Sequence, residues 1–259
     1  MTSMNTPVGS LDHAGRVALV TGGTRGIGAA ISRRLLEQGA HVAAVFATNT
    51  EAASAFATSV DELPGTLSLH QLDIADQAAC RAVVAQVVAG HGRIDHLVNN
   101  AGLLIENSAR KMTAEEWDLA LAVNLSPAFH LAQAALEPMI AQGFGRIVNI
   151  SSVTATMGNS AEVGYGAAKA GLHGFSRSLA RSVIRKGITV NVVIPGVFET
   201  DMVAAMPIAA QEAIKAAIPM GRRGDPDELA HAVMFLLDER AAYVTGSVVT
   251  VDGGLSMGG

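Results

Sequence analysis

Short apolar runs rich in β-branched residues alternate along the chain with longer Ala-rich segments, and this alternation narrows the folds open to it. Strands separated by helical segments of this length form right-handed βαβ units and a parallel sheet. Because the runs are apolar at nearly every position, helices should cover both faces of the sheet. The predicted strands are residues 16–21, 41–46, 66–73, 93–99, 145–151, 187–194 and 246–251. The pattern predicts an α/β fold built on a doubly wound parallel sheet of about seven strands.

The segments between these runs have helical spacing. In the first of them Ile27, Ile31 and Leu35 recur every four residues, and Gly39 stands where a helix C-terminus would place a glycine. No Pro- or Gly-rich linker divides the 259 residues, so we expect one domain over 1–259. Residues 197–222, which carry Met and Pro breaks between the last two strands, are predicted to form a lid over the substrate.

Composition excludes several classes of partner. Apolar residues make up 49% of the chain and charged residues 16%, which suits a buried core. The net charge is -5 without a basic run, so no nucleic-acid partner is expected. Cys80 is the single cysteine, which suits a reducing compartment. The N-terminus lacks the apolar stretch of a signal peptide, and no run predicts a membrane span. We therefore expect a cytoplasmic protein.

A glycine-rich turn, TGGTRGIG at 21–28, joins the first predicted strand to the first helix. Gly22 would permit a tight turn, Gly26 would let a pyrophosphate approach, and Gly28 would let the helix lie close to the sheet. The helix N-terminus would offer free amides and the positive end of its dipole to the phosphates. The motif, in this context, predicts a Rossmann-type nicotinamide dinucleotide site.

The end of the second strand indicates which nicotinamide cofactor is bound. Folds that bind NAD usually place a carboxylate there for the ribose 2′-hydroxyl. This chain reads Phe-Ala-Thr-Asn-Thr over 46–50, with no carboxylate before Glu51. Arg25 in the glycine turn could pair with a 2′-phosphate, the alternative being a solvated surface arginine. The sequence favours NADP(H).

Tyr165 and Lys169 lie four residues apart and would share one face of a helix. Reduction of a carbonyl needs a proton donor, and the phenol pKa is near 10 unless a neighbouring ammonium lowers it. Ser152, at the end of the fifth strand, could hydrogen-bond the substrate oxygen. Ser151 is the competing choice, because alternate residues of a strand face opposite sides.

Asn124 is polar within an otherwise apolar helical stretch. It is either a satisfied core amide or a residue that holds a water linking Lys169 to solvent. Pro127 would loosen the local helix ladder and leave a carbonyl free.

Taken together, these motifs resemble the short-chain dehydrogenase/reductase family from about Arg16 to the C-terminus. The matching motifs are TGGTRGIG at 21–28, LDI at 72–74, NNAG at 99–102, Asn124, ISS at 150–152, YGAAK at 165–169 and PGVFETDM at 195–202. Each motif is short, but their joint order and spacing are specific. The resemblance implies an NADP-dependent oxidoreductase that acts on CH-OH groups and forms a homotetramer, with no metal.

The resemblance also implies a role for each matching position. The catalytic tetrad would be Asn124, Ser152, Tyr165 and Lys169. The cofactor would contact Gly22, Thr24, Arg25, Gly26, Ile27, Gly28, Ala47, Thr48, Asp73, Ile74, Asn100, Ala101, Gly102, Tyr165, Lys169, Pro195, Gly196, Phe198 and Thr200.

Within the family the chain looks most like the 3-oxoacyl-thioester reductases that act on acyl carrier protein or CoA. Two features depart from that subgroup. Residues 103–107 read Leu-Leu-Ile-Glu-Asn instead of a Thr-Arg-Asp-Asn run, and a usually basic position near Gly143 is not basic, although Arg185 and Lys186 are available. The alternatives are a dehydrogenase of a sugar, steroid or small alcohol, and a non-catalytic nucleotide sensor on the same fold.

Overall fold

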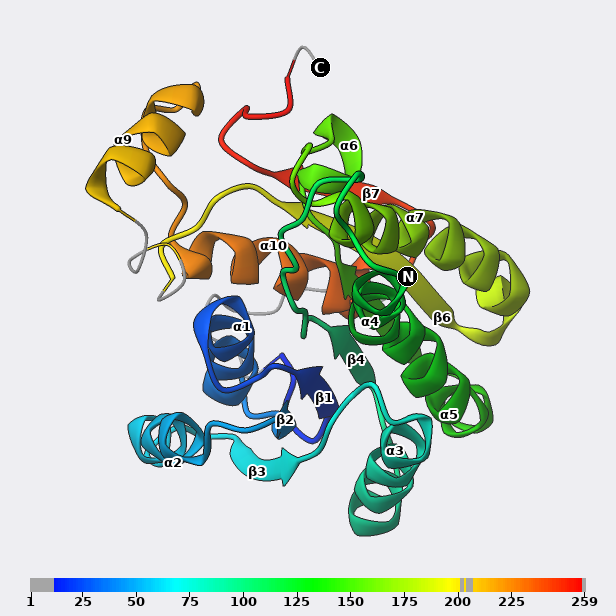
Figure 1. Ribbon diagram of the computed structural model, residues 1–259. Coiled ribbons are helices and arrows are strands. Elements are labelled where there is room, and N and C mark those ends of the chain that lie inside the picture. Colours follow the sequence, from blue (N-terminus) through cyan, green and yellow to red (C-terminus); the bar gives the residue numbers. More distant parts are fainter. Residues whose placement is uncertain (1–11, 201–202, 204–206, 258–259) are drawn as a thin grey trace.

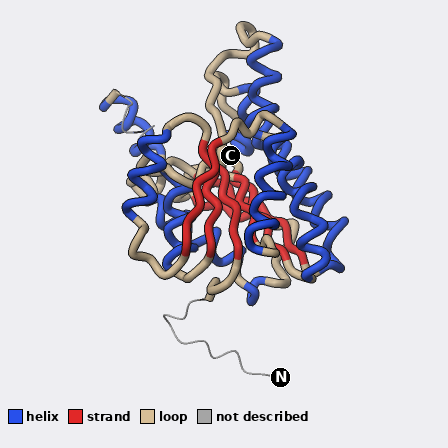
Figure 2. The backbone as a smooth tube through the Cα atoms, turned by 90° about the horizontal axis from the view of Figure 1, so that it is seen from below, coloured by secondary structure: helices blue, strands red, loops and turns tan. Residues whose placement is uncertain are grey.

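The computed structural model describes residues 12–200, 203 and 207–257. One seven-stranded parallel sheet has the order β3-β2-β1-β4-β5-β6-β7. The strands are β1 Val17–Thr21, β2 His41–Phe46, β3 Thr66–Gln71, β4 His96–Asn99, β5 Gly145–Ile150, β6 Ile188–Pro195 and β7 Val248–Val251. Figure 2 shows these strands between helices on both sides. The predicted α/β fold, a Rossmann-type doubly wound sheet of seven strands, is confirmed.

The helices of the described residues are α1 Gly26–Glu37, α2 Thr50–Ser59, α3 Gln77–His91, α4 Ala114–Asn124, α5 Ser126–Gln142, α6 Thr154–Met157, α7 Val163–Val183, α9 Ile208–Ala217 and α10 Pro226–Leu237, with 3-10 turns at Ile184–Lys186 and Glu239–Ala241 (Figure 1). In β1, Ala18 and Val20 join the core beneath α1 and α10, whereas Val17 and Leu19 join the core beneath α3, α5 and α7. This period of two explains why the strand is apolar throughout.

Helix α1 ends as its sequence predicts. Gly39 has φ +80°, its amide donates to Leu36 O at 3.0 Å, and the Ala40 amide donates to Leu35 O at 3.0 Å. This pair of bonds is a Schellman motif, which requires a residue that tolerates positive φ. The predicted fourth strand is shorter than 93–99, because Arg93 ion-pairs with Asp95, whose carboxylate also accepts the Val17 amide at 2.9 Å. Residues 93–95 therefore bind the start of β1 and do not form part of β4.

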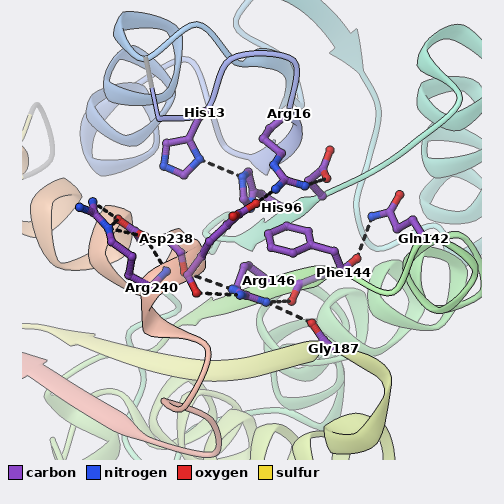
Figure 3. A network of polar contacts seen from close by, with 12 residues as sticks. His13, Arg16, His96, Gln142, Phe144, Arg146, Gly187, Asp238 and Arg240 are labelled. Atoms are coloured by element: carbon purple, nitrogen blue, oxygen red, sulfur yellow. Dashed lines mark hydrogen bonds and ion pairs between the residues drawn. The ribbon is translucent and has the colours of Figure 1, made fainter. Parts of the chain in front are cut away.

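A polar network occupies the edge of the sheet where the strands begin (Figure 3). The Phe144 ring lies between the guanidinium groups of Arg16 and Arg146, at 4.0 and 4.3 Å from the ring centroid. The buried rings of His13 and His96 make a 3.0 Å Nδ1–Nε2 contact, and burial lowers the pKa of both. These contacts join the starts of several strands, at the edge opposite the glycine turn.

The stretch Ala114–Gln142 is, by length and composition, apolar enough to cross a membrane, with a mean hydropathy of 1.3 over its most apolar window of 18 residues. The structure breaks it at Leu125, where φ is −126° and ψ is −55°. On either side of the break, α4 packs against α7 and α5 packs against α3. This packing buries part of the stretch, with 39% of its most apolar window inside the protein.

Candidate active site

The candidate site lies where the sheet order reverses, between the carboxyl ends of β1 and β4. Thr21 joins the two strand ends, because its Oγ1 accepts the amides of Asn100 and Ala101 at 2.9 and 3.0 Å. The Asn100 side chain returns a bond to Thr21 O at 2.9 Å. The predicted cofactor residues Asn100 and Ala101 are thus held against the glycine turn by Thr21, which the sequence reading did not single out.

The glycine turn needs its glycines for backbone reasons. Gly22 has φ +63° and Gly26 has φ +51°, a region that other residues seldom adopt. A Cβ on Gly28 would lie 2.0 Å from Gly22 O, so the start of α1 can approach the turn only without a side chain. Gly23 is constrained as well, since a Cβ there would lie 2.9 Å from Val20 O. The turn is a tight backbone cradle, as the motif predicts.

The N-terminus of α1 opens into this cradle. Arg25 is its N-cap residue, no side chain caps the first amides, and the first turn carries no acidic residue. Thr24 is buried beneath the turn, and Ile27 is half-buried. Thr200 lies over the turn, its Cγ2 being 3.5 Å from the position of a Cβ on Gly26. Uncapped amides at the positive end of a helix dipole suit a pyrophosphate, so the cradle fits a dinucleotide cofactor.

The region expected to hold the 2′-phosphate is exposed and lies beside the glycine turn, where the Gly23 amide donates to Val45 O at 3.1 Å. Ala47 and Thr48 follow β2 and are exposed, and Ala47 O accepts a bond from Gln71 Nε2 at 3.0 Å. Arg25 is exposed and makes no hydrogen bond or ion pair with the described residues. No acidic residue lies between the end of β2 and Glu51 in the first turn of α2, so a phosphate directly after β2 could pair with Arg25.

The expected adenine contacts follow β3. Asp73 is exposed, and its Oδ1 accepts the Ala75 amide at 2.9 Å. Ile74 is buried, and its carbonyl accepts a bond from Cys80 Sγ at 3.2 Å. Local bonds therefore hold both positions directly after β3, the strand that pairs with β2.

Lys169 reaches the site from α7. Its side chain is buried, its Nζ donates to Ile150 O at 3.0 Å, and burial lowers its pKa to about 8. A Cβ on Gly102 would lie 3.3 Å from that Nζ and 2.8 Å from Asn124 Oδ1. Gly102 is therefore the spacer that lets Lys169 and Asn124 approach the loop after β4.

Asn124 is held by the same loop. Its Oδ1 accepts the Leu103 amide at 3.0 Å, and its Nδ2 donates to Leu103 O and Ala120 O at 2.9 Å each. The helix breaks directly after it, and the Ala128 amide donates to Leu125 O at 3.2 Å. Pro127, in the first turn of α5, has no amide to donate. The hydrogen bonds of the Asn124 side chain thus support the first of the two alternatives, a core amide with all its partners. The helix break lies next to the backbone carbonyl of Asn124.

The two serines after β5 face different surroundings. Ser151 is buried, and its hydroxyl donates to Lys169 O at 3.0 Å and contacts His173 Nε2 at 2.8 Å. The Ser152 hydroxyl accepts the Thr154 amide at 3.2 Å and hydrogen-bonds Tyr165, which lowers the phenol pKa. Ser152, rather than Ser151, is therefore the serine that shares a site with Tyr165.

The pKa of Tyr165 departs from the sequence expectation. Burial raises it, the Ser152 hydrogen bond lowers it, and the charge of Glu162 raises it. Lys169 Nζ lies 5.7 Å from the centroid of the phenol ring and donates to a backbone carbonyl instead. A raised pKa keeps the phenol protonated near neutral pH, which is the form that a proton donor needs.

The remaining predicted cofactor positions follow β6. Pro195 ends the strand, and the Gly196 amide donates to Val251 O at 2.9 Å. Phe198 is buried and forms a bridge with Gly224, where a Cβ would lie 2.5 Å from the ring. The predicted lid at 197–222 continues into α9, which stands away from the sheet (Figure 1). Residues 201–202 and 204–206 of that lid lie outside the described residues.

Buried polar contacts behind the site were also missed from the sequence. Asn99 Nδ2 donates to Asn149 Oδ1 at 2.7 Å, and Asn149 Nδ2 donates to Ser176 Oγ at 2.8 Å. These two hydrogen bonds tie β4, β5 and α7 together. Polar residues inside otherwise apolar strands were the available signal. Across the described residues no group of three or more His, Cys, Asp or Glu side chains could hold a metal ion.

Comparison with known proteins adds an independent line of evidence. The profile of a protein family described as "Enoyl-(Acyl carrier protein) reductase" matches residues 22–256. The 3-oxoacyl-(acyl-carrier-protein) reductase FabG of Escherichia coli K12 is 43% identical over 95% of this chain and 100% of its own length. An acetoacetyl-CoA reductase of Shinella zoogloeoides is 42% identical over 92% of this chain and 98% of its own. Nodulation protein G of Azospirillum brasilense is 41% identical over 93% and 98%.

Proposed function

The chain belongs to the short-chain dehydrogenase/reductase family, and on that premise we propose that it is an NADPH-dependent reductase of 3-oxoacyl thioesters. The observation that carries the proposal is the meeting of Ser152, Tyr165 and Lys169 beside the dinucleotide cradle. A hydroxyl, a phenol and a buried ammonium are what reduction of a carbonyl needs. A protein that only sensed a nucleotide would not need that set.

The cradle would hold the cofactor through backbone groups. The amides at the start of α1 and the loop after β4 would take the pyrophosphate and ribose, and Arg25 would take the 2′-phosphate of NADP. Asp73 and Ile74 would line the adenine, and Pro195 to Thr200 would border the nicotinamide. When bound, the reduced nicotinamide supplies the hydride.

The protein's own residues would manage the oxygen and its proton. The Ser152 hydroxyl donates a hydrogen bond to the substrate carbonyl and fixes it beside Tyr165. The phenol then gives its proton to the oxygen as negative charge develops there. Lys169 would stabilise the resulting phenolate and would hold the cofactor ribose. Because the pKa of Lys169 is about 8, most Lys169 side chains carry the charged ammonium form near neutral pH.

The proposal that the substrate is a thioester comes from the relatives and from the loop at residues 103–105. Two of the relatives are named for 3-oxoacyl and acetoacetyl thioesters. Leu103 is 42% exposed, and Leu104 and Ile105 beside it are half-buried. This apolar loop, which follows Gly102, is better suited to cover an acyl chain than to cover a polar sugar.

The remaining assignments follow the same resemblance. We propose a single domain with a lid at 197–222, in a homotetramer that pairs the helices α4, α5 and α7 with those of its neighbours. Leu119 and Phe129 on these helices are 44% and 45% exposed, as an interface would require. Arg185 and Lys186 are exposed and could receive an acidic acyl carrier protein. Cytoplasmic location is part of the proposal.

The test is an NADPH oxidation assay with acetoacetyl-CoA, run beside crotonyl-CoA and a panel of sugars, steroids and small alcohols with NADP. The proposal requires that acetoacetyl-CoA give the highest kcat/KM. Crotonyl-CoA reports the alternative chemistry named in the family description. A higher kcat/KM with crotonyl-CoA, or with an alcohol of the panel, would overturn the substrate assignment.

A further inference from the structure

A fixed carboxylate stands at the mouth of the site. Glu162 directly precedes α7 and lies three residues before Tyr165. Its side chain does not cap the helix. Instead Thr154 Oγ1 donates to Oε2 at 2.8 Å, and Asn159 Nδ2 donates to Oε1 at 2.6 Å. Both oxygens are therefore held in place by neutral donors.

The contacts of Thr154 place this carboxylate beside the reacting groups. The Thr154 amide donates to Ser152 Oγ at 3.2 Å, and the same residue's hydroxyl binds Glu162. Thr154 also packs on the first turn of α7, since a Cβ on Gly166 would lie 3.3 Å from its Cγ2. One residue thus contacts both the serine and the carboxylate, and the charge of Glu162 is felt by the Tyr165 phenol.

Glu162 has no direct ion-pair partner among the described residues, since no Lys, Arg or His there forms an ion pair with it. Neutral hydrogen bonds stabilise a carboxylate without cancelling its charge. An approaching substrate would therefore meet a fixed negative charge next to Ser152 and Tyr165.

We propose that Glu162 is a specificity-determining residue that selects neutral 3-oxo esters and thioesters and disfavours free 3-oxo acids, whose own carboxylate would stand beside the reacting carbonyl. The inference rests on the proposed function, because it concerns which 3-oxo compounds the site accepts. For two unit charges about 7–8 Å apart at an effective dielectric of about 20, the repulsion would lower kcat/KM by about 30- to 50-fold, and solvent around the half-buried Glu162 would reduce this toward 10-fold.

The experiment compares acetoacetate with methyl acetoacetate, which share the 3-oxo chain and differ in charge. The ratio of kcat/KM for the ester to kcat/KM for the acid is measured in wild type, in Glu162→Gln and in Glu115→Gln. The ratio cancels any common effect of a substitution on turnover or folding. Glu115→Gln removes the same charge from an exposed carboxylate in the first turn of α4 and serves as the matched control.

We expect Glu162→Gln to lower the ester-to-acid ratio by about 10-fold or more and the control to leave it within twofold. A ratio unchanged in Glu162→Gln, or lowered equally in the control, would overturn the inference. A second test needs no variant: acetoacetylcholine, a cationic 3-oxo ester, should match or exceed methyl acetoacetate in wild type, and a lower kcat/KM would contradict the charge filter.

The outcomes also separate the two proposals. If wild type reduces acetoacetyl-CoA but takes the acid as readily as the ester, the charge filter is wrong and the reductase assignment stands. If wild type reduces none of these compounds with NADPH, the substrate class is wrong and the inference falls with it.

Discussion

Replacing Arg25 by Ala should remove most of the preference for NADPH over NADH. Arg25 is exposed at the N-terminus of α1 and pairs with no described residue. A charge-assisted hydrogen bond contributes about 1.5–3 kcal/mol. Solvent screening at an exposed site places the effect near the lower end, about 1.5–2 kcal/mol, or roughly 10- to 30-fold.

The reverse substitution tests the other half of this reasoning. Ala47→Asp introduces a carboxylate at the end of β2, where it would repel a 2′-phosphate and accept hydrogen bonds from a ribose diol. Ala47 is exposed, and its backbone carbonyl rather than its side chain accepts the bond from Gln71, so the fold should tolerate the change. This variant should prefer NADH.

The assay is the ratio of kcat/KM for NADPH to kcat/KM for NADH at a fixed concentration of acetoacetyl-CoA. Arg181→Ala, which removes an exposed arginine far along α7, is the control and should leave the ratio unchanged. Raising the ionic strength should shrink the wild-type ratio and spare that of Arg25→Ala. A wild-type preference for NADH, or an Arg25→Ala ratio equal to that of wild type, would refute the reasoning.

Three further outcomes follow. Lys169→Ala should lower turnover and also weaken NADPH binding, measured by fluorescence titration; an unchanged cofactor Kd would argue against the ribose contact. Because the pKa of Lys169 is about 8, its ammonium is present below that pH, so kcat/KM for reduction should fall as the pH rises through about 8; a rate that stays flat to pH 10 would contradict this role. Burial, with His91 and His70 nearby, lowers the pKa of His41 to about 4. Between pH 6.5 and 4 the imidazole of His41 is therefore protonated in the unfolded chain and neutral in the folded one. The free energy of unfolding should fall as the pH is lowered through this range. After allowance for the partial exposure of His41, this group should account for about 1–2 kcal/mol of the fall. Urea denaturation of wild type and His41→Gln should show the smaller fall in the variant, and equal slopes would exclude His41 as the cause.

Much of the fold was readable because its signals are local. The apolar runs, the glycines of the turn and Gly39 each act through backbone geometry within a few residues. The choice between Ser151 and Ser152 was not local, because it depends on which hydroxyl faces His173 on α7 and which faces Tyr165.

The polar contacts of the site were the least predictable part. Thr21 joins two strand ends through bonds to residues about 80 positions away in the chain, and no short motif records that pairing. The pKa of Tyr165 was expected to be lowered by Lys169, yet burial raises it, since the extent of burial depends on the whole site. The contacts of Glu162 likewise needed three-dimensional placement of the loop between α6 and α7.

The central claim is that Tyr165 supplies the proton in a reductase reaction, and its most direct test is the rate of a single turnover of acetoacetyl-CoA by the NADPH-loaded Tyr165→Phe variant. A positioned general acid contributes about 10²- to 10⁴-fold, so the rate should fall by that factor. NADPH should still bind within a few-fold of its wild-type Kd, because the phenol acts mainly on the transition state. A variant that kept a tenth or more of the wild-type rate would have lost about 1.4 kcal/mol or less, and Tyr165 would not be the acid.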